Sequence, residues 1–285
     1  MTNTLGIIGG SGLYKIDKLH QSKTHDLNTP WGRPSDSIVE CSYEKKNFFF
    51  IPRHGSNHNL PPSQINYRAN IDALKQLGVT DVLSISSVGS LNETLTPGEF
   101  IIIDQYIDMT KYRKSTFFDD DIVVHVSMAN PTDKTLMQVA EHSLNELSIS
   151  FTNGGSYVCI EGPQFSSYFE SKTFQNWGCD VIGMTSMPEA KLCKEASLRY
   201  VNIGMITDYD CWHPNYDNVE VSNVIKTLND NATKAKRFML QFISEYSEIT
   251  FKETLNSFTS LVTPKDKIKE KTIHKLKNIM PDLLK

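Results

Sequence analysis

The chain has 285 residues, with 39% hydrophobic and 22% charged side chains and a formal net charge of −4. These values fit a globular protein of one large domain, or of a domain with an appendage, and the mild acidity gives no general attraction to nucleic acid or anionic membranes, so we expect small-molecule partners. The five cysteines are scattered and form no Cys-x-x-Cys pair, which predicts a reduced, cytoplasmic setting. We find no basic leader before an apolar run and no apolar run near the roughly 20 residues that span a bilayer, so we expect a protein that is not bound to membranes.

Short runs rich in Val, Ile, Leu and Phe predict the strands. Most of these runs are continuous rather than alternating in hydrophobicity, which is typical of a sheet covered on both faces. In chain order they span residues 5–10, 47–55, 81–90, 99–108, 157–163, 180–185 and 200–210.

Helical patterns lie between these strands. Apolar residues at helical spacing predict helices over residues 66–78, 131–147, 187–200 and 221–246. Strands that alternate with helices predict an α/β fold, a central sheet flanked by helices. We divide the chain into a main domain over 1–248 and a helical extension of the same domain over 249–285. The extension is Lys-rich but keeps apolar residues at roughly helical spacing, namely Ile268, Leu276, Ile279 and Leu283. We therefore expect it to pack on the body of its own chain or on a neighbouring subunit rather than on a membrane surface.

The segment LGIIGGSGLY places glycines and a serine where the first predicted strand ends. A dinucleotide fingerprint requires Gly-x-Gly-x-x-Gly, but here Gly10-Ser11-Gly12 is followed by Leu, Tyr and Lys, so the third glycine is missing. A Gly-x-Ser-x-Gly nucleophile elbow fails as well, because Leu13 stands at the last glycine position. The segment is therefore either a small-anion nest of backbone N–H groups and a serine hydroxyl, or a turn needed only for chain reversal.

Polar groups suited to an oxyanion follow three other predicted strands. Arg53 and His54 stand where one strand stops, and Ser86 and Ser87 lie near the end of another. Thr185 comes directly before a helix whose N-terminus favours an anion. Each residue alone is more often a cap or a surface turn than a ligand. Because ligands of α/β sheets gather at the carboxyl ends of strands, together they predict one anion site.

The last predicted strand ends with two acids. Strand alternation points Asp208 and Asp210 to one side and Tyr209 to the other. Two carboxylates beside a bound phosphate would repel it unless a group with N–H donors and a basic nitrogen, such as a nucleobase, lies between them. The alternatives are a pair of solvated acids, or a metal site in which His213 is the lone further candidate ligand.

These motifs resemble the methylthioadenosine-cleaving members of the trimeric purine nucleoside phosphorylase family. The resemblance covers residues from about 5 to about 245 and rests, in order, on LGIIGGSGLY, PRHG, GSL, IDQYID, IEGPQFSS, DVIGMTSMPEA and TDYDCWH. It implies a single α/β domain with a mixed, twisted central sheet and a homotrimer with sites near the subunit interfaces. It also implies phosphorolysis of 5'-methylthioadenosine to adenine and 5-methylthioribose 1-phosphate, without metal or organic cofactor, as a step of purine and methionine salvage.

The resemblance implies roles for particular residues. It places the phosphate on Ser11, Arg53, His54, Ser86, Ser87 and Thr185, and the nucleoside against Phe165, Ser166, Met184, Asp208, Asp210 and Val221. It implies that His125 reaches the methylthio pocket of a neighbouring subunit. Asp208 is the expected proton donor or proton-sharing partner of purine N7, and Asp210 is expected to accept from the 6-amino group. Ser11 and Ser86 stand where threonine is frequent, Ser87 replaces a small apolar residue, and Gly183 replaces an asparagine of some members.

Two features favour a 6-aminopurine substrate. A carboxylate pair accepts hydrogen bonds from an amino group and repels a carbonyl, and Ser166 stands where 6-oxopurine members have a glutamate that binds the base. The nearest alternative is a 6-oxopurine phosphorylase acting on methylthioinosine, inosine or guanosine. A nucleosidase that uses water would not need Arg53 and several hydroxyls, and a catalytically silent nucleoside-binding module would not need paired acids.

Overall fold

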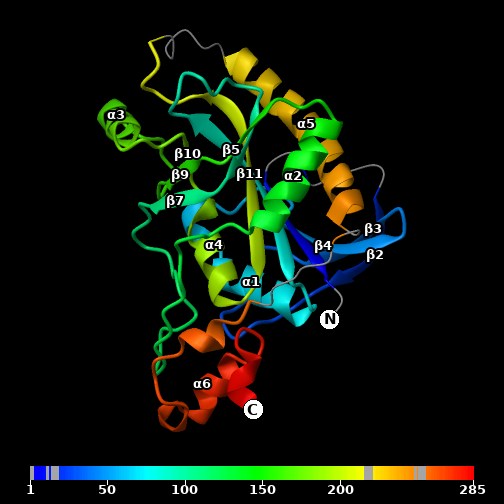
Figure 1. Cartoon of the computed structure of the whole chain (residues 1–285), viewed down its shortest axis with the longest axis vertical. Helices are drawn as coiled ribbons and strands as arrows, with labels where there is room; N and C mark the ends of the chain where they lie inside the picture. Colours follow the sequence, from blue (N-terminus) through cyan, green and yellow to red (C-terminus); the bar gives the residue numbers. More distant parts are fainter. Residues whose placement is uncertain (1–2, 11–12, 14–18, 215–220, 247–248, 250–254) are drawn as a thin grey trace.

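A mixed sheet runs through the centre of the molecule (Figure 1). The computed structural model describes residues 3–10, 13, 19–214, 221–246, 249 and 255–285, with side chains of the helix at 221–246 described from Lys226 onward. Within these residues the sheet has 11 strands: β1 Leu5–Gly9, β2 His20–His25, β3 Ile38–Tyr43, β4 Lys46–Pro52, β5 Asp81–Ser90, β6 Phe100–Ile103, β7 Gln105–Asp108, β8 Phe151–Asn153, β9 Ser156–Cys159, β10 Val181–Gly183 and β11 Arg199–Tyr209.

Helices cover both faces of the sheet, as the continuous apolar strands require. They are α1 Tyr67–Gln76, α2 Lys134–Glu146, α3 Tyr168–Asn176, α4 Ser186–Glu195, α5 Val221–Tyr246 and α6 Glu270–Lys275. Figure 1 shows α2 and α5 together on one side of the sheet and α1 and α4 on the other. The expected fold class, a single α/β domain with a mixed sheet between helices, is therefore confirmed.

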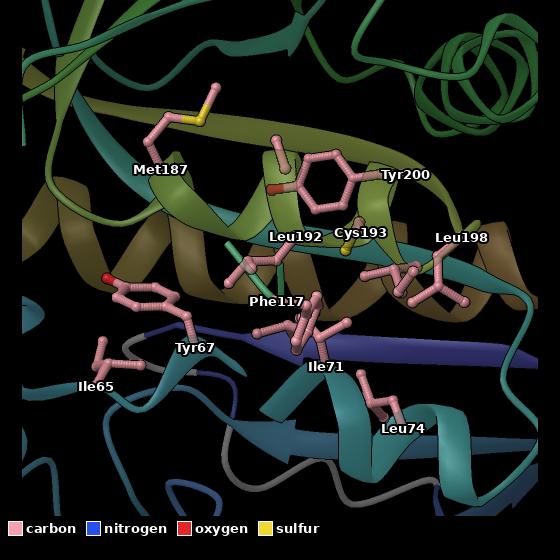
Figure 2. Close-up of a cluster of buried hydrophobic side chains, with 14 of the residues drawn as sticks. Ile65, Tyr67, Ile71, Leu74, Phe117, Met187, Leu192, Cys193, Leu198 and Tyr200 are labelled. Carbon is pink, nitrogen blue, oxygen red and sulfur yellow. The ribbon is translucent and has the colours of Figure 1, made fainter. Parts of the chain in front are cut away.

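Each face of the sheet has its own apolar core. On one face, α5 packs Phe238 and Phe242 against strand residues such as Ile203. On the other face, Tyr67, Ile71 and Leu74 of α1 lie opposite Leu192 and Cys193 of α4, with Phe117 between them (Figure 2). Burying both faces fixes the sheet rigidly, so loops at its strand ends are held on a stable scaffold.

Strand β5 is the branch point of the sheet. Along its first half it pairs with β1, the last partners being Ile8 and Ser84, and at its end it pairs with β10 through Gly89 and Ser90. Strand β11 runs beside it on the other edge over its whole length. Within the described residues, positions 85–88 therefore have no strand partner on the β1/β10 edge. The main chain is exposed there to whatever lies between β1 and β10, which is the crevice where α/β sheets bind ligands.

Most predicted elements are confirmed, with differences at their ends. The run 99–108 forms two strands, β6 and β7, because the chain leaves one partner for another at Asp104. The predicted helix 187–200 is wrong at its end: α4 stops at Glu195, the chain reverses through Ser197 at a φ of 55°, and Arg199 begins β11.

Four elements have no apolar signal strong enough to predict them. They are the exposed polar strand β2, the half-buried β3, the three-residue β8, and α3. Helix α3 carries a capping box, in which the Ser167 side chain accepts from the Glu170 N–H and the Glu170 side chain accepts from the Ser167 N–H. The spacing Ser-x-x-Glu is a start signal that the sequence offered.

The C-terminal residues pack on the body of the domain. Ile268, Leu276, Ile279 and Leu283 are all buried and belong to the same core cluster as α1 and α4. In Figure 1 this orange and red segment caps one end of the molecule. The helix there, α6, is short, and 3-10 turns account for much of the rest. Among the described residues, none of the helices combines the length and apolar character that crossing a bilayer requires.

Candidate active site

A cavity of about 620 Å³ opens beside the unpaired edge of β5. Ten of the residues predicted for the site line it: Arg53, His54, Ser86, Ser87, Phe165, Ser166, Met184, Thr185, Asp208 and Asp210. These residues come from the ends of β4, β5, β10 and β11 and from the loop before α3, so the fold brings together groups that are up to 157 positions apart, from Arg53 to Asp210. Gly10 lines the cavity as well, at the end of β1.

Arg53 is buried and largely committed to the protein itself. Its Nε and Nη2 donate to the two carboxylate oxygens of Glu189 at 2.8 and 3.1 Å, Nη2 also donates to Ser84 Oγ at 2.7 Å, and Nη1 donates to the Ile85 carbonyl at 3.1 Å. Four of the five N–H groups of a guanidinium are thus used. The remaining Nη1 hydrogen has no acceptor among the described residues, and a Cβ built on Gly10 would lie 3.4 Å from Nη1. Arg53 is a fixed donor whose charge is already balanced by Glu189.

His54 is a neutral imidazole in this setting. Its Nδ1 lies 2.8 Å from the Leu60 carbonyl, and because a carbonyl only accepts, Nδ1 must carry the proton. Burial lowers the pKa of His54 to about 4, so at neutral pH Nε2 has no proton and is an acceptor. His54 also stacks on His58, with ring centroids 4.7 Å apart. A phosphate could meet Nε2 only through a P–OH group.

Three hydroxyls complete the predicted anion end. Ser86 Oγ receives an N–H from Asn202 at 3.4 Å, which leaves its own proton free to donate. Ser87 Oγ is buried without a hydrogen-bond partner in the described structure. Thr185 stands at the N-cap of α4, yet its side chain accepts no capping hydrogen bond. These hydroxyls have donor capacity to offer a ligand in the cavity.

The two acids lie beside Gly89 of β5, three residues further along that strand than Ser86. A Cβ built on Gly89 would be 3.1 Å from Asp208 Oδ1 and 3.7 Å from Asp210 Cβ, so both acids lie close to this residue of β5. A bulge at Thr207 shifts the β11 register just before Asp208. Both carboxylates line the cavity, as alternation predicts, while Tyr209 stacks on His213 at 4.3 Å.

The environments of the two acids differ. Burial, with a smaller contribution from the negative charge of Asp210, raises the pKa of Asp208 to about 6. The Thr207 hydroxyl, which donates to Asp208 Oδ2 at 2.7 Å, lowers the pKa and so opposes these two effects. Asp210 accepts from Ser166 Oγ at 2.6 Å. Asp208 therefore holds a proton more readily than an ordinary aspartate, as a general acid must.

The walls between these two ends are mainly apolar. Phe165 stands at the cavity with 75% of its surface exposed, and Met184 packs under the Gly162 turn, where a Cβ would lie 2.6 Å from the Met184 sulfur. Ile160, Val88 and Leu228 add further apolar surface. A wall of this kind suits the faces of a base and a sugar.

Three predicted residues are not placed in the cavity. Ser11 lies outside the described residues, and the side chain of Val221, the first residue of α5, is not described either. His125 is described but does not line this cavity. Its N–H donates to the Ser260 carbonyl at 3.0 Å, beside a bridge between Val124 and Leu261.

Several functional residues were missed by reasoning from the sequence. Glu189 orients Arg53, and its Oε1 also accepts from Ser84 Oγ at 2.6 Å and from the Tyr200 hydroxyl at 2.9 Å. Asn202 in turn donates to Ser84 Oγ at 2.9 Å. The available signal was an acid inside the buried segment MPEAKLC, because a buried carboxylate needs a paired cation. In the described part of the chain, no three His, Cys, Asp or Glu side chains gather as metal ligands.

Comparison with known proteins places this geometry among relatives. Residues 4–244 match the family model described as the phosphorylase superfamily. The chain is 50% identical over 232 residues to an S-methyl-5'-thioadenosine phosphorylase of Rhodospirillum rubrum, covering 81% of this chain and 79% of the relative. It is 42% identical over 281 residues to an enzyme of the same name from Koribacter versatilis, covering 98% and 96% of the two chains.

Solved structures give the same result. A methylthioadenosine phosphorylase from an antarctic soil metagenomic library superposes with a TM-score of 0.92 at 41% identity, covering 98% of this chain and 99% of that one. A methylthioadenosine phosphorylase from Schistosoma mansoni in complex with tubercidin superposes with a TM-score of 0.82 at 32% identity, covering 87% and 93%.

Proposed function

The chain belongs to the phosphorylase superfamily, and from this premise we propose that it cleaves S-methyl-5'-thioadenosine with inorganic phosphate, giving adenine and 5-methylthioribose 1-phosphate. It is an enzyme of the pentosyltransferase class. The single observation that carries the assignment of the site is the layout along β5. Donors for an oxyanion gather at Ser86, and the acid pair lies at Gly89, about 10 Å further along the strand.

The two ends of the cavity suit the two charges of the reaction. Breaking the glycosidic bond leaves positive charge on the sugar and negative charge on the departing purine. Phosphate held by Arg53 Nη1, the Ser86 and Thr185 hydroxyls and the end of β1 stabilises the sugar cation and then bonds to its anomeric carbon. Glu189 prevents Arg53 from turning away, so the guanidinium is oriented before phosphate arrives.

At the other end, Asp208 supplies the proton that the purine requires. Its raised pKa keeps it protonated more readily than an ordinary carboxyl, and a bound phosphate anion nearby raises that pKa further. Asp210, fixed by the Ser166 hydroxyl, accepts from the 6-amino group. A protonated Asp208 donates to N7 as the glycosidic bond breaks, so the leaving group departs as neutral adenine.

The acid pair disfavours a 6-oxopurine substrate. Asp210 has its Ser166 hydrogen bond already, and a second carboxylate facing a carbonyl oxygen would repel it. Cleavage by water is disfavoured as well, because a water molecule would have no use for Arg53, Ser86 and Thr185 at one end of the cavity.

Assembly and location follow the same premise. We infer a homotrimer in which a neighbouring subunit contributes His125 to the methylthio pocket, since His125 does not reach the cavity of its own chain. The five free thiols suit the cytoplasm. Inorganic phosphate is a substrate, and the proposed chemistry calls on no metal or organic cofactor.

Phosphate dependence tests this function directly. Purified protein with S-methyl-5'-thioadenosine should release adenine only when phosphate is present, and the sugar product should be the 1-phosphate. Thr185→Val keeps the side-chain shape but removes the hydroxyl, so the phosphate KM should rise about tenfold, the value of one hydrogen bond to a charged group. Thr233→Val, on the exposed face of α5, is the matched control and should leave the KM unchanged. Adenine release at the same rate in phosphate-free buffer would contradict the proposal.

A further inference from the structure

Gly183 lies on the cavity wall directly against a tyrosine that the cavity does not reach. A Cβ built on Gly183 would lie 2.1 Å from the hydroxyl oxygen of Tyr157 and 2.7 Å from its Cζ, distances that no side chain could tolerate. Tyr157 is fully buried in β9, and the register pairs it with Val181, two residues before Gly183. Its ring leans along the strand, so the hydroxyl fills the space where position 183 would otherwise carry a side chain.

The Tyr157 hydroxyl is a hydrogen-bond acceptor for the turn that carries Thr185. The Thr185 N–H donates to it at 3.2 Å. Cys159, the next residue of β9 on the same face, accepts the Met187 N–H at 3.4 Å through its sulfur. Two side chains of β9 thus hold alternate N–H groups of the turn 185–187.

The turn needs such support because it is not yet helix. Met187 has a φ of −116° and a ψ of 135°, so regular helical geometry begins only after it, and the Thr185 side chain does not cap the helix. Without intrahelical partners, the N–H groups of residues 185 and 187 depend on Tyr157 and Cys159. Thr185 lines the cavity, so its place there depends on how that turn is held.

We propose that Tyr157 is a positioning residue for the phosphate end of the site: it fixes the turn that presents Thr185, and its hydroxyl requires glycine at 183. The proposal rests on the proposed function for the identity of the anion. Tyr157 touches no substrate atom, since it lies behind Gly183 and outside the cavity lining. Its effect should therefore appear in phosphate binding and not in the recognition of the base.

Tyr157→Phe removes the acceptor and keeps the ring. The phosphate KM should rise by about 3- to 10-fold, as expected for the loss of one hydrogen bond, while the nucleoside KM at saturating phosphate stays within about twofold of the wild-type value. Tyr106→Phe is the matched control. Its ring lies 5.9 Å from that of Tyr157, the residue is half-buried, and its hydroxyl is buried without a hydrogen-bond partner among the described residues. It should change neither KM.

Calorimetric titration with inorganic phosphate separates this inference from the proposed function. If the wild-type protein binds phosphate but does not turn over the nucleoside, the proposed function fails, yet the phosphate Kd of Tyr157→Phe still tests the positioning role. A Kd within twofold of the wild-type value, or equal rises in both KM values, would show that Tyr157 only packs the core.

Gly183→Ala provides a second test that does not depend on Tyr157→Phe folding well. The added methyl must displace the Tyr157 hydroxyl, so this variant should show the same rise in phosphate KM. In the double variant with Tyr157→Phe, Gly183→Ala should raise the phosphate KM much less than it does alone, because the hydroxyl that the methyl group would displace is already absent. Independent, additive effects on the phosphate KM would overturn the proposed link between the two positions.

Discussion

Asp208 lies in β11 and Asp210 directly follows the end of that strand, but their surroundings give them different chemistry. Burial and the neighbouring charge keep the pKa of Asp208 high, whereas Asp210 is held by the Ser166 hydroxyl. Arg53 shows the same principle at the other end of the cavity, where Glu189, Ser84 and the Ile85 carbonyl together engage four of its five N–H groups. Neighbouring side chains therefore select one role for each ligand-binding group.

Asp208→Asn should separate proton donation from binding. The Thr207 hydroxyl can still donate to the amide oxygen, so the fold should persist, but the amide cannot protonate N7. Loss of a positioned proton donor lowers kcat for S-methyl-5'-thioadenosine by about 10²- to 10⁴-fold. Methylthioinosine should lose far less, because the amide N–H group that replaces the carboxyl can donate a hydrogen bond to the 6-carbonyl or to N7 of that substrate.

The ratio of kcat/KM for the two substrates, in wild type and in Asp208→Asn, is the deciding measurement. Asp230→Asn, on the exposed part of α5, is the control for a lost carboxylate and should leave the ratio unchanged. Equal slowing of both substrates would assign Asp208 a general binding or structural role.

The pH profile should report the same carboxyl. If the acid form of Asp208 is the active one, as we propose, its pKa of about 6 means that kcat/KM for the nucleoside at low phosphate should fall as the pH rises above about 6. Saturating phosphate adds a nearby negative charge, so the falling limb should move to higher pH. Initial rates between pH 5 and 9 in wild type and Asp208→Asn test this prediction. A falling limb that persists in the variant would belong to another group.

Among the elements, β5 does most to build the site. Because β5 pairs first with β1 and then with β10, residues 85–88 have no strand partner on that edge, and Ser86, Ser87 and Val88 line the cavity. The Ile85 carbonyl accepts a hydrogen bond from Arg53 Nη1 instead of from a strand N–H. The C-terminal extension is the second element with a clear task. It forms a bridge from Leu261 to Val124 and receives the N–H of His125 on the Ser260 carbonyl, so it holds the segment that carries His125.

We propose that the extension, 249–285, folds as one unit with the main domain, 1–248. Leu276 is fully buried in the core cluster of α1 and α4, so Leu276→Ala should lower the free energy of unfolding by about 2–5 kcal/mol. Urea unfolding followed by both circular dichroism and tryptophan fluorescence should give coincident transitions at a lower midpoint. An early, separate transition that leaves phosphorolysis intact would mean that the extension is an independent appendage.

At the scale of the whole molecule, the cavity of one chain is incomplete if the methylthio group needs His125. The described chain places His125 on the segment paired with the C-terminal residues and outside the cavity. Light scattering should therefore give a particle of three chains. His125→Ala should lower the preference for S-methyl-5'-thioadenosine over adenosine by about 10-fold, within the range for one apolar contact. A fully active monomer would refute both the assembly and the role of His125.

Before any coordinates, the sequence determined the elements and the chemistry at the strand ends. Apolar runs marked most of the central strands, and Arg53, Ser86, Thr185, Asp208 and Asp210 at their ends were predicted as anion and base ligands. These signals are local: a buried strand needs a continuous apolar run, and a ligand group must follow where the run stops. The resemblance to a known family supplied the reaction and the roles of individual residues.

The tertiary structure alone decided how these groups are held. Glu189 follows Arg53 by 136 positions, yet the two side chains form a buried ion pair. Tyr157 precedes Gly183 by 26 positions, yet its hydroxyl fills the space that a side chain at position 183 would need. The open edge at residues 85–88 exists only because β5 changes partners between β1 and β10. Contacts of this kind depend on distances set by packing across the sheet, and a linear pattern of residue types carries no record of those distances.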